Sequence, residues 1–321
     1  MTYDKTFQKN MLSWTVALHE FHTYLHLERS FSEHTVAAYL RDAKAIHHFT
    51  SIHYPLITPA DLTETHIQHY LAHLLDMGIS PYTQARMLSG ARVFYEFLLM
   101  NNYITKNPFA LIESPKLPKK LPDVLTVEEI DRMIVANDLT TSEGIRNKAI
   151  LEMLYATGMR VSELVQLRLQ DIDMDLCFVN IFGKGKKERL TPMSDSAVES
   201  LKVYLASVRN HQMAKKDSQH IVFLNRRGEK LSRVMIFLII KKLAQKANII
   251  KNVSPHTFRH SFATHLIENG ADLRAVQEML GHESITTTEI YTHLDMKHLR
   301  NVVLQYHPRV RWKTQQTSMS L

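Results

Sequence analysis

Residues 254–291 read SPHTFRHSFATHLIENGADLRAVQEMLGHESITTTEIY, a stretch that predicts helices presenting two histidines, one arginine and one tyrosine. Ser254 is a suitable N-cap with Pro255 at the first helical position, so His256 and Arg259 fall in the first turn. Residues three apart share one helix face, and the free backbone N–H groups there favour an anion. An imidazole beside a guanidinium at this helix start therefore predicts a site for a phosphate oxygen.

A second helix is expected directly after the first. Asp272 is a suitable cap for it, and Gly281 is a suitable end, with His282 immediately behind. Ser284 then caps the helix or turn that delivers Tyr291. Each of these residues alone has an ordinary explanation, since HxxR on a helix is usually a solvated face and a tyrosine near a chain end usually packs.

Length, charge and composition limit the kinds of partner and compartment that fit this chain. The 321 residues are enough for two domains, each with its own core. A formal net charge of +7 and an isoelectric point near 9.3 indicate an acidic partner, nucleic acid first, with ribosome or membrane-surface binding as alternatives. The apolar run VMIFLII at 234–240 is far too short for membrane insertion. The first residues lack the apolar core of a secretion signal, and the single cysteine, Cys177, fits a reducing cytoplasm.

Nineteen histidines raise the question of a metal site. His19, His22 and His26 share one face of a predicted helix, but neither an HExxH motif nor a cysteine or carboxylate cluster accompanies them. We therefore interpret them as surface histidines and expect neither a metal nor another cofactor.

The amino-terminal third predicts four amphipathic helices with short connections, which is typical of a small bundle. The first carries an apolar stripe from Phe7 to Leu25, the second begins near Ser32, and the fourth has the clearest start, Ser80 followed by Pro81. Polar residues on these helices either lie along a DNA groove or form ordinary solvated surface; they are Arg41, Lys44, Gln84, Arg86 and Arg92.

The segment at 107–123, NPFALIESPKLPKKLPD, holds four prolines, which preclude a continuous helix, and three lysines. It predicts an extended, positive linker at 108–122 between a helical domain at 1–107 and a second domain at 123–321. Such a linker would let the two domains close around a rod-like polyanion.

The second domain opens with a capping box, Thr126 with Glu129, and its next helix is expected to end at Gly158. Arg160 follows that turn within TGMRVSEL. Glu163 is near enough to pair with it, and on its own this spacing favours a structural ion pair.

Two β-rich runs, LCFVNI and ERLTPM, flank residues 182–187 and predict a hairpin with a basic, glycine-containing tip. The tip is not a nucleotide-binding P-loop, because the GxxxxGK[ST] spacing is absent. Lys184 on this tip can reach into a site built by other elements. Further helices are expected near 194–208 and 232–246, with a short strand at 221–224.

The order Arg160, Lys184, His256-x-x-Arg259, His282, Tyr291 resembles that of the tyrosine recombinase (phage integrase) family. TGMRVSEL, GKGKKERLTP, TTTEIYTH and the stretch at 254–282 resemble its Xer branch, the chromosome-dimer resolvases. Departures are minor, with Met159 and Glu283 in place of commoner residues, and none removes a catalytic group.

The resemblance implies a mainly α (α+β) fold. It consists of a four-helix, SAM-like core-binding domain and a mostly helical catalytic domain with a small antiparallel sheet, which together form a C-shaped clamp around DNA. It also implies a terminal helix near 295–305 that docks into a neighbouring protomer, and the apolar spacing of Leu299, Val302 and Val303 fits this. The alternative is a helix that folds back onto its own domain.

By the same resemblance, Tyr291 is the nucleophile that attacks a DNA phosphodiester, leaving a 3′-phosphotyrosyl link and a free 5′-hydroxyl. His256 would help to remove the phenol proton, and Lys184 would protonate the leaving 5′-oxygen. Because the link keeps the bond energy, rejoining needs neither metal nor ATP.

The resemblance also assigns the residues that hold the phosphate. Arg160 and Arg259 would bind the non-bridging oxygens of the phosphorane, where guanidinium forks match the developing charge. His282 would position the scissile phosphate.

The partners that the family implies are double-stranded DNA with a dif-like site, and a sister Xer recombinase in a heterotetramer or further copies of this chain in a homotetramer. Control by the septal DNA translocase FtsK, and a cytoplasmic, nucleoid-associated location, belong to the same expectation.

Three other functions stay open at this stage. A phage or transposon integrase of the same family is the nearest, although such proteins commonly carry an extra arm-binding domain, whereas this chain begins almost at its first core helix. A non-catalytic DNA-binding protein is expected to have lost at least one of the six catalytic positions, yet all six are present. Type IB topoisomerase-like relaxation uses the same chemistry. Whether the DNA products are relaxed or recombined would distinguish the two activities.

Overall fold

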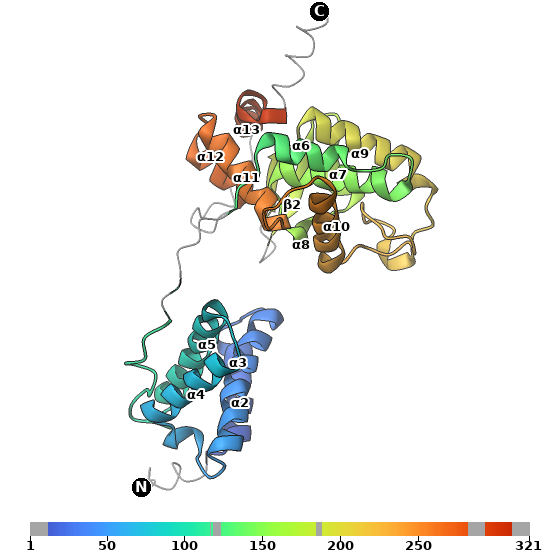
Figure 1. The fold of residues 1–321 in the computed structure, drawn as a ribbon. Helices are drawn as coiled ribbons and strands as arrows, with labels where there is room; N and C mark the ends of the chain where they lie inside the picture. Colours follow the sequence, from blue (N-terminus) through green and yellow to red (C-terminus); the bar gives the residue numbers. More distant parts are fainter. Residues whose placement is uncertain (1–11, 116, 118–122, 184–187, 282–292, 310–321) are drawn as a thin grey trace, which may run out of the picture. The chain divides into compact units, whose positions relative to one another are not determined.

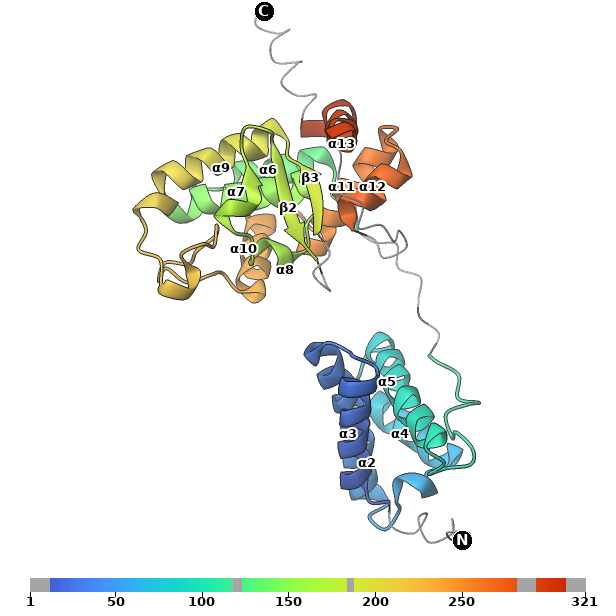
Figure 2. The same cartoon turned by 180° about the vertical axis from the view of Figure 1, so that it is seen from behind.

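A computed structural model describes residues 12–115, 117, 123–183, 188–281 and 293–309, without the side chains of 293–295. The chain divides into two compact units, Met1–Lys120 and Leu121–Leu321, and each has a hydrophobic core of its own (Figure 1; Figure 2). Among the described helices, none combines the length and the apolar character that crossing a bilayer requires.

The amino-terminal unit is the predicted bundle of four helices. Its elements are α2 (Trp14–Thr23), a π-helical turn (Tyr24–Glu28), α3 (Glu33–His53), a 3-10 turn (Pro59–Asp61), α4 (Glu64–Asp76) and α5 (Pro81–Met100). Ser32 and Ser80 cap α3 and α5, since their hydroxyls accept from the backbone N–H groups of Thr35 and Thr83.

The apolar stripe of the first helix forms one wall of this core. Trp14, Leu18, Phe21 and Leu25 are buried, and the ring of Phe21 meets that of Phe94 on α5 edge-on, with centroids 5.1 Å apart. Members of the stripe up to residue 11 lie outside the described residues.

The same core extends past the predicted end of the first domain. Phe109 and Ile112 are buried in it, and the Phe109 ring lies 5.0 Å from that of Tyr95. Prolines stop a helix, but they do not keep the apolar residues between them from packing. The predicted linker at 108–122 therefore starts too early.

Three of the polar residues considered for a DNA groove are bonded within this unit. Gln84 and Arg92 donate to backbone carbonyls, and Arg86 Nη1 donates to both carboxylate oxygens of Asp42, at 2.7 and 2.6 Å. The other two are exposed.

The carboxy-terminal unit is mostly helical with one small sheet. Its helices are α6 (Val127–Val135), α7 (Ser142–Thr157), α8 (Val161–Leu164), α9 (Asp195–Ser207), α10 (Arg233–Lys246), α11 (Pro255–Glu268), α12 (Leu273–Leu280) and α13 (His293–Tyr306). The strands are β1 (Ile172–Asp173), β2 (Phe178–Phe182) and β3 (Glu188–Pro192), antiparallel in the order β1-β2-β3. The predicted hairpin is thus present, with Phe182 opposite Glu188 at its described end.

The strand expected at 221–224 is not formed. Ile221 and Leu224 make isolated bridges to Arg168 and Lys230 instead. Because the two ends of the segment face different partners, no continuous ladder develops.

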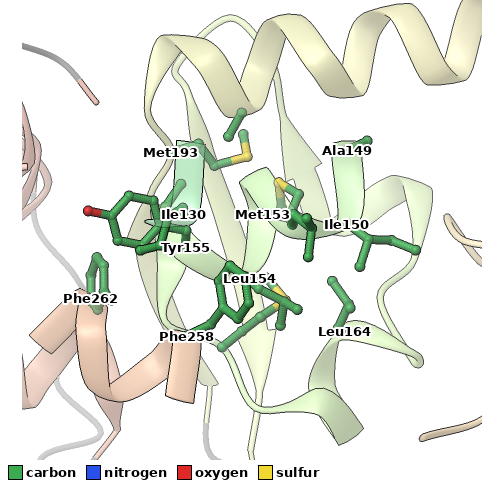
Figure 3. Packing of buried hydrophobic residues seen from close by; sticks show 14 of the residues in the cluster. Ile130, Ala149, Ile150, Met153, Leu154, Tyr155, Leu164, Met193, Phe258 and Phe262 are labelled. Atoms are coloured by element: carbon green, nitrogen blue, oxygen red, sulfur yellow. The ribbon is translucent and has the colours of Figure 1, made fainter. Parts of the chain in front are cut away.

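Helix α7 runs through the centre of the core, and every residue from Ala149 to Thr157 is buried. Figure 3 shows Leu154 and Tyr155 near Phe258 and Phe262 of α11. A helix buried on all sides has no polar face, so amphipathic periodicity cannot reveal it.

Helix α13 packs on its own unit. Leu299, Val302 and Val303 are buried in the carboxy-terminal core, beside β3, α11 and α12. In the single chain, the stripe considered for docking on a neighbour is thus covered by its own domain. Exchange of this helix between protomers stays a prediction.

Candidate active site

Two of the six predicted catalytic residues, Arg160 and Arg259, lie next to the turn at Gly158. Helix α7 ends at Gly158, whose φ of 59° is left-handed, and a Cβ there would lie 2.5 Å from the Phe262 ring and 2.9 Å from Leu280. Only glycine fits this turn, which places Arg160 at the start of α8.

Arg259 joins the ends of two helices. Its Nη1 donates to the Gly158 carbonyl at 2.8 Å and its Nη2 to the Leu280 carbonyl at 2.7 Å. Carbonyls at helix ends lack intrahelical partners, so a guanidinium fork satisfies both. Arg259 thereby lies between the turn before Arg160 and the turn before His282.

Arg160 makes the ion pair that its spacing predicted. Its Nη1 lies 3.0 Å from Glu163 Oε1, its backbone N–H donates to Glu163 Oε2 at 2.6 Å, and its Nη2 reaches the Gly281 carbonyl at 3.4 Å. The Arg160 side chain is still 39% exposed. The ion pair therefore orients the guanidinium without hiding it.

A third arginine, Arg189 on β3, completes the group and was not singled out from the sequence. It is buried, and it donates to both oxygens of Glu163 at 2.9 and 2.8 Å. Alternation along the strand puts Arg189 on the same face as Thr191, and the structure shows that this face is the buried one.

The electrostatics of this group favour an anion. Burial, then the charges of Arg160 and Arg189, lower the pKa of Arg259 to about 10, while Glu163 opposes this shift. Burial raises the pKa of Glu163, but hydrogen bonds and charge from Arg189 and Arg160 outweigh it and hold the pKa below its usual value. At neutral pH three cations therefore surround one carboxylate.

His256 lies in the first turn of α11, as predicted, and its side chain is exposed. Ser254 caps this helix by accepting from the Thr257 N–H at 3.4 Å. His256 precedes Arg259 by one turn, so an imidazole and a guanidinium share this helix start.

Lys184, His282 and Tyr291 lie outside the described residues. Their neighbours along the chain are described. Strands β2 and β3 flank the hairpin tip, and Gly281, whose carbonyl meets Arg160, is the residue before His282.

His19, His22 and His26 are exposed, as the surface interpretation predicted. Across the described parts of the chain, no group of three or more His, Cys, Asp or Glu side chains is arranged to hold a metal ion.

Comparison with known families decides the identity. Residues 123–298 match the phage integrase family, and residues 18–102 match the phage integrase N-terminal SAM-like domain. The chain belongs to the phage integrase family. The recombinase resemblance read from the motifs is thereby confirmed.

Relatives place this recombinase in the Xer branch. It is 45% identical over 293 residues to proteins named tyrosine recombinase XerD from Staphylococcus epidermidis and Staphylococcus haemolyticus, covering 91% of this chain and 98% of each relative. It is accordingly a DNA strand-exchange enzyme of the class that uses a tyrosine nucleophile.

Solved structures share the fold. XerH recombinase bound to difH substrate in a pre-cleavage complex gives a TM-score of 0.67 at 21% identity, covering 91% of this chain and 95% of that one. A lambda integrase dimer bound to a COC′ core site gives 0.66 at 20% identity, covering 86% and 98%. The predicted mainly α fold with a small antiparallel sheet is confirmed.

Proposed function

We propose that this recombinase cuts and rejoins double-stranded DNA at dif-like sites, and so resolves chromosome dimers for segregation at cell division. The observation that carries the proposal is the joint placement of Arg160 and Arg259 against the turn at Gly281, which leads into the segment with His282 and Tyr291. The XerD name of the relatives supports the biological role.

Arg160 and Arg259 would bind the non-bridging oxygens of the scissile phosphate. Each has five N–H donors, and the described contacts of Arg259 leave some of them free for a ligand. Because main-chain carbonyls and Glu163 fix both guanidiniums beforehand, little reorganisation is needed as charge develops on the phosphorane.

Tyr291 would attack the phosphorus, forming the 3′-phosphotyrosyl bond while the bond to the 5′-oxygen breaks. A phenol has an ordinary pKa of about 10, so it needs a base, and exposed His256 beside Arg259 suits this role. Lys184 would give a proton to the leaving 5′-oxygen, and His282 would position the phosphate. The reverse steps join a new strand without ATP.

The working assembly would be a tetramer on two duplexes, either with a sister Xer recombinase or with four copies of this chain. Exchange of α13 between protomers would couple assembly to cleavage, and the FtsK translocase would control the timing. We place the protein with the nucleoid in the cytoplasm.

The test is covalent trapping on a nicked suicide duplex with a dif-like site, with EDTA present, followed by a denaturing gel. Wild-type protein should give a shifted DNA–protein band and Tyr291→Phe should not, while Tyr39→Phe, which removes a hydroxyl from α3, should behave as wild type. Binding without a band, even after a sister subunit is added, would point to a non-catalytic DNA-binding protein. Equal trapping on unrelated duplexes would argue against a dif-like target.

A further inference from the structure

Arg189 is a buried charge in contact with several parts of the active site. Only 5% of its side chain is exposed, and its Nε donates to the Met279 carbonyl at 2.8 Å, in addition to the two bonds to Glu163. An arginine is costly to bury unless its N–H donors find acceptors, and here each of its three nitrogens donates to a different oxygen atom.

The first segment that Arg189 holds is the start of α8. Both Glu163 oxygens accept from Arg189, and the same two oxygens accept from the backbone and side chain of Arg160. A bidentate guanidinium fixes the plane of a carboxylate. The Arg160 side chain therefore docks on a carboxylate whose position Arg189 sets.

The second segment is the end of α12. Its carbonyl at Met279 accepts from Arg189, and Gly281 follows with a left-handed φ of 66°. A Cβ on Gly281 would lie 3.0 Å from Arg189 Cδ and 3.3 Å from Nη1, so the arginine lies directly under this turn. The next residue is His282.

The third segment is the hairpin. Arg189 pairs with Ile181 in the ladder between β2 and β3, one position from its described end. The strand that returns from the tip containing Lys184 is therefore tied to α8 and α12 by one side chain.

We propose that Arg189 is a positioning residue of this active site, fixing Arg160 through the shared Glu163 carboxylate and setting the turn before His282. The inference rests on the proposed function. It assigns Arg189 no contact with DNA, because only 5% of its side chain is exposed.

A pH signature separates this role from simple structural support. Burial alone would raise the pKa of Glu163, and Arg189 is the largest influence that lowers it. Without Arg189 the carboxyl faces Arg160 from α8 and Arg259 from α11, so its pKa rises and it takes up a proton at a higher pH than in wild type. Cleavage by Arg189→Met should therefore lose more of its rate toward acid pH than wild-type cleavage does. In the double variant Arg189→Met/Glu163→Gln this additional loss should be absent.

The experiment measures single-turnover covalent complex formation on the suicide duplex, together with duplex binding by gel shift, from pH 5.5 to 9. Arg189→Met should bind DNA as wild type does but cleave ~100-fold more slowly, since small displacements of catalytic groups cost about that much. Arg189→Lys keeps the charge and one donor, and should fall between the two. Arg146→Met is the matched control, because Arg146 is also buried and donates to the Leu224 carbonyl.

The outcomes are distinct. If wild type forms no covalent complex even after a sister subunit is added, the proposed function fails. The positioning role is wrong if Arg189→Met cleaves as fast as wild type. It is also wrong if Arg189→Met loses binding and cleavage in equal measure, which is the result expected of Arg146→Met, where only structural support is lost. If Arg189→Met does not fold, Arg189→Lys decides: cleavage equal to wild type at every pH overturns the inference, and slower cleavage with intact binding supports it.

Discussion

The guanidinium of Arg309 and the carboxylate of Glu152 form a buried ion pair, with Nη2 and Oε1 2.6 Å apart, that ties the segment after α13 to the middle of α7. Arg309 Nη1 also lies 2.9 Å from Asp131 on α6. Since α13 is the helix considered for exchange between protomers, this clamp decides how firmly its far end is held in its own chain.

Removal of the clamp should destabilise the carboxy-terminal unit. Arg309→Met leaves the buried carboxyl of Glu152 and the partly buried carboxyl of Asp131 without their cation, and breaking one side of a buried pair costs about 3–5 kcal/mol. The free energy of unfolding, measured by urea titration with circular dichroism, should fall by roughly this amount. Arg226→Met removes an exposed arginine from its pair with Glu143 and should cost at most about 1 kcal/mol. Equal losses in the two variants would contradict a buried clamp.

His307 should make stability depend on pH. Burial lowers its pKa to about 3, although its ring bonds to the Tyr155 carbonyl, whereas an unfolded histidine has a pKa near 6.5. The stabilising contribution is complete above pH 6.5. Below it, the unfolded chain takes up a proton that the native state refuses, and stability falls by about 1.4 kcal/mol per pH unit.

The measurement compares unfolding free energies of wild type and His307→Gln between pH 8 and 5. The unfolding free energy of the variant should fall less steeply toward acid pH. Subtracting the two curves removes the contribution of the carboxyl groups that both proteins share. His298→Gln, an exposed position on α13, is the matched control. A variant slope as steep as wild type would show that His307 already binds its proton in the native state.

In the amino-terminal unit, Gly90→Ala should destabilise a helix that alanine normally favours. A Cβ at this position of α5 would lie 2.5 Å from Asp42 Oδ2 and 2.7 Å from Asp42 Cβ, so the buried carboxylate paired with Arg86 would have to move. Overpacking of this kind costs about 1–3 kcal/mol. Thermal unfolding should reveal a lower Tm, while Ser89→Ala next to it should leave the Tm nearly unchanged. A Tm increase for Gly90→Ala would mean that helix propensity outweighs the clash.

At the candidate active site, Arg259→Lys should separate binding from cleavage. Lysine keeps the charge but cannot reach the Gly158 and Leu280 carbonyls and a phosphate oxygen together. We expect about a 100-fold loss in covalent complex formation, the size seen when one preorganised donor is removed, with duplex affinity nearly unchanged. Arg274→Lys on the exposed side of α12 is the control, and both rates are read from the suicide duplex. Full activity in Arg259→Lys would remove Arg259 from the proposed mechanism.

The sequence predicted what depends on local pattern. The helices that begin after Ser32, Ser80 and Ser254 could be predicted, because an N-cap acts within one turn. The ion pair of Arg160 and Glu163 could be predicted from their spacing alone. The helix start at Ser254 singled out Arg259, the resemblance gave it a role, and the structure places its guanidinium against the Gly158 and Leu280 carbonyls. Lys184, His282 and Tyr291 stay predictions.

What the sequence could not show depends on contacts between distant segments. The bond of Arg189 to Glu163 crosses from a strand to a helix, and only the hairpin register turns that arginine inward. Phe109 and Ile112 follow a proline, so the local pattern predicted that they belong to a linker. In the structure both are buried in the amino-terminal core. The apolar stripe on α13 could pack either on its own domain or on a neighbouring protomer, and its periodicity does not distinguish the two.

The three arginines around Glu163 also bear on why the protein recognises a phosphate at all. In the absence of DNA, Arg160, Arg189 and Arg259 repel one another across a single carboxylate, and burial together with that repulsion lowers the pKa of Arg259. A phosphodiester placed there would relieve it. Under the proposed function, DNA is therefore the missing counter-ion of the folded chain as well as its substrate.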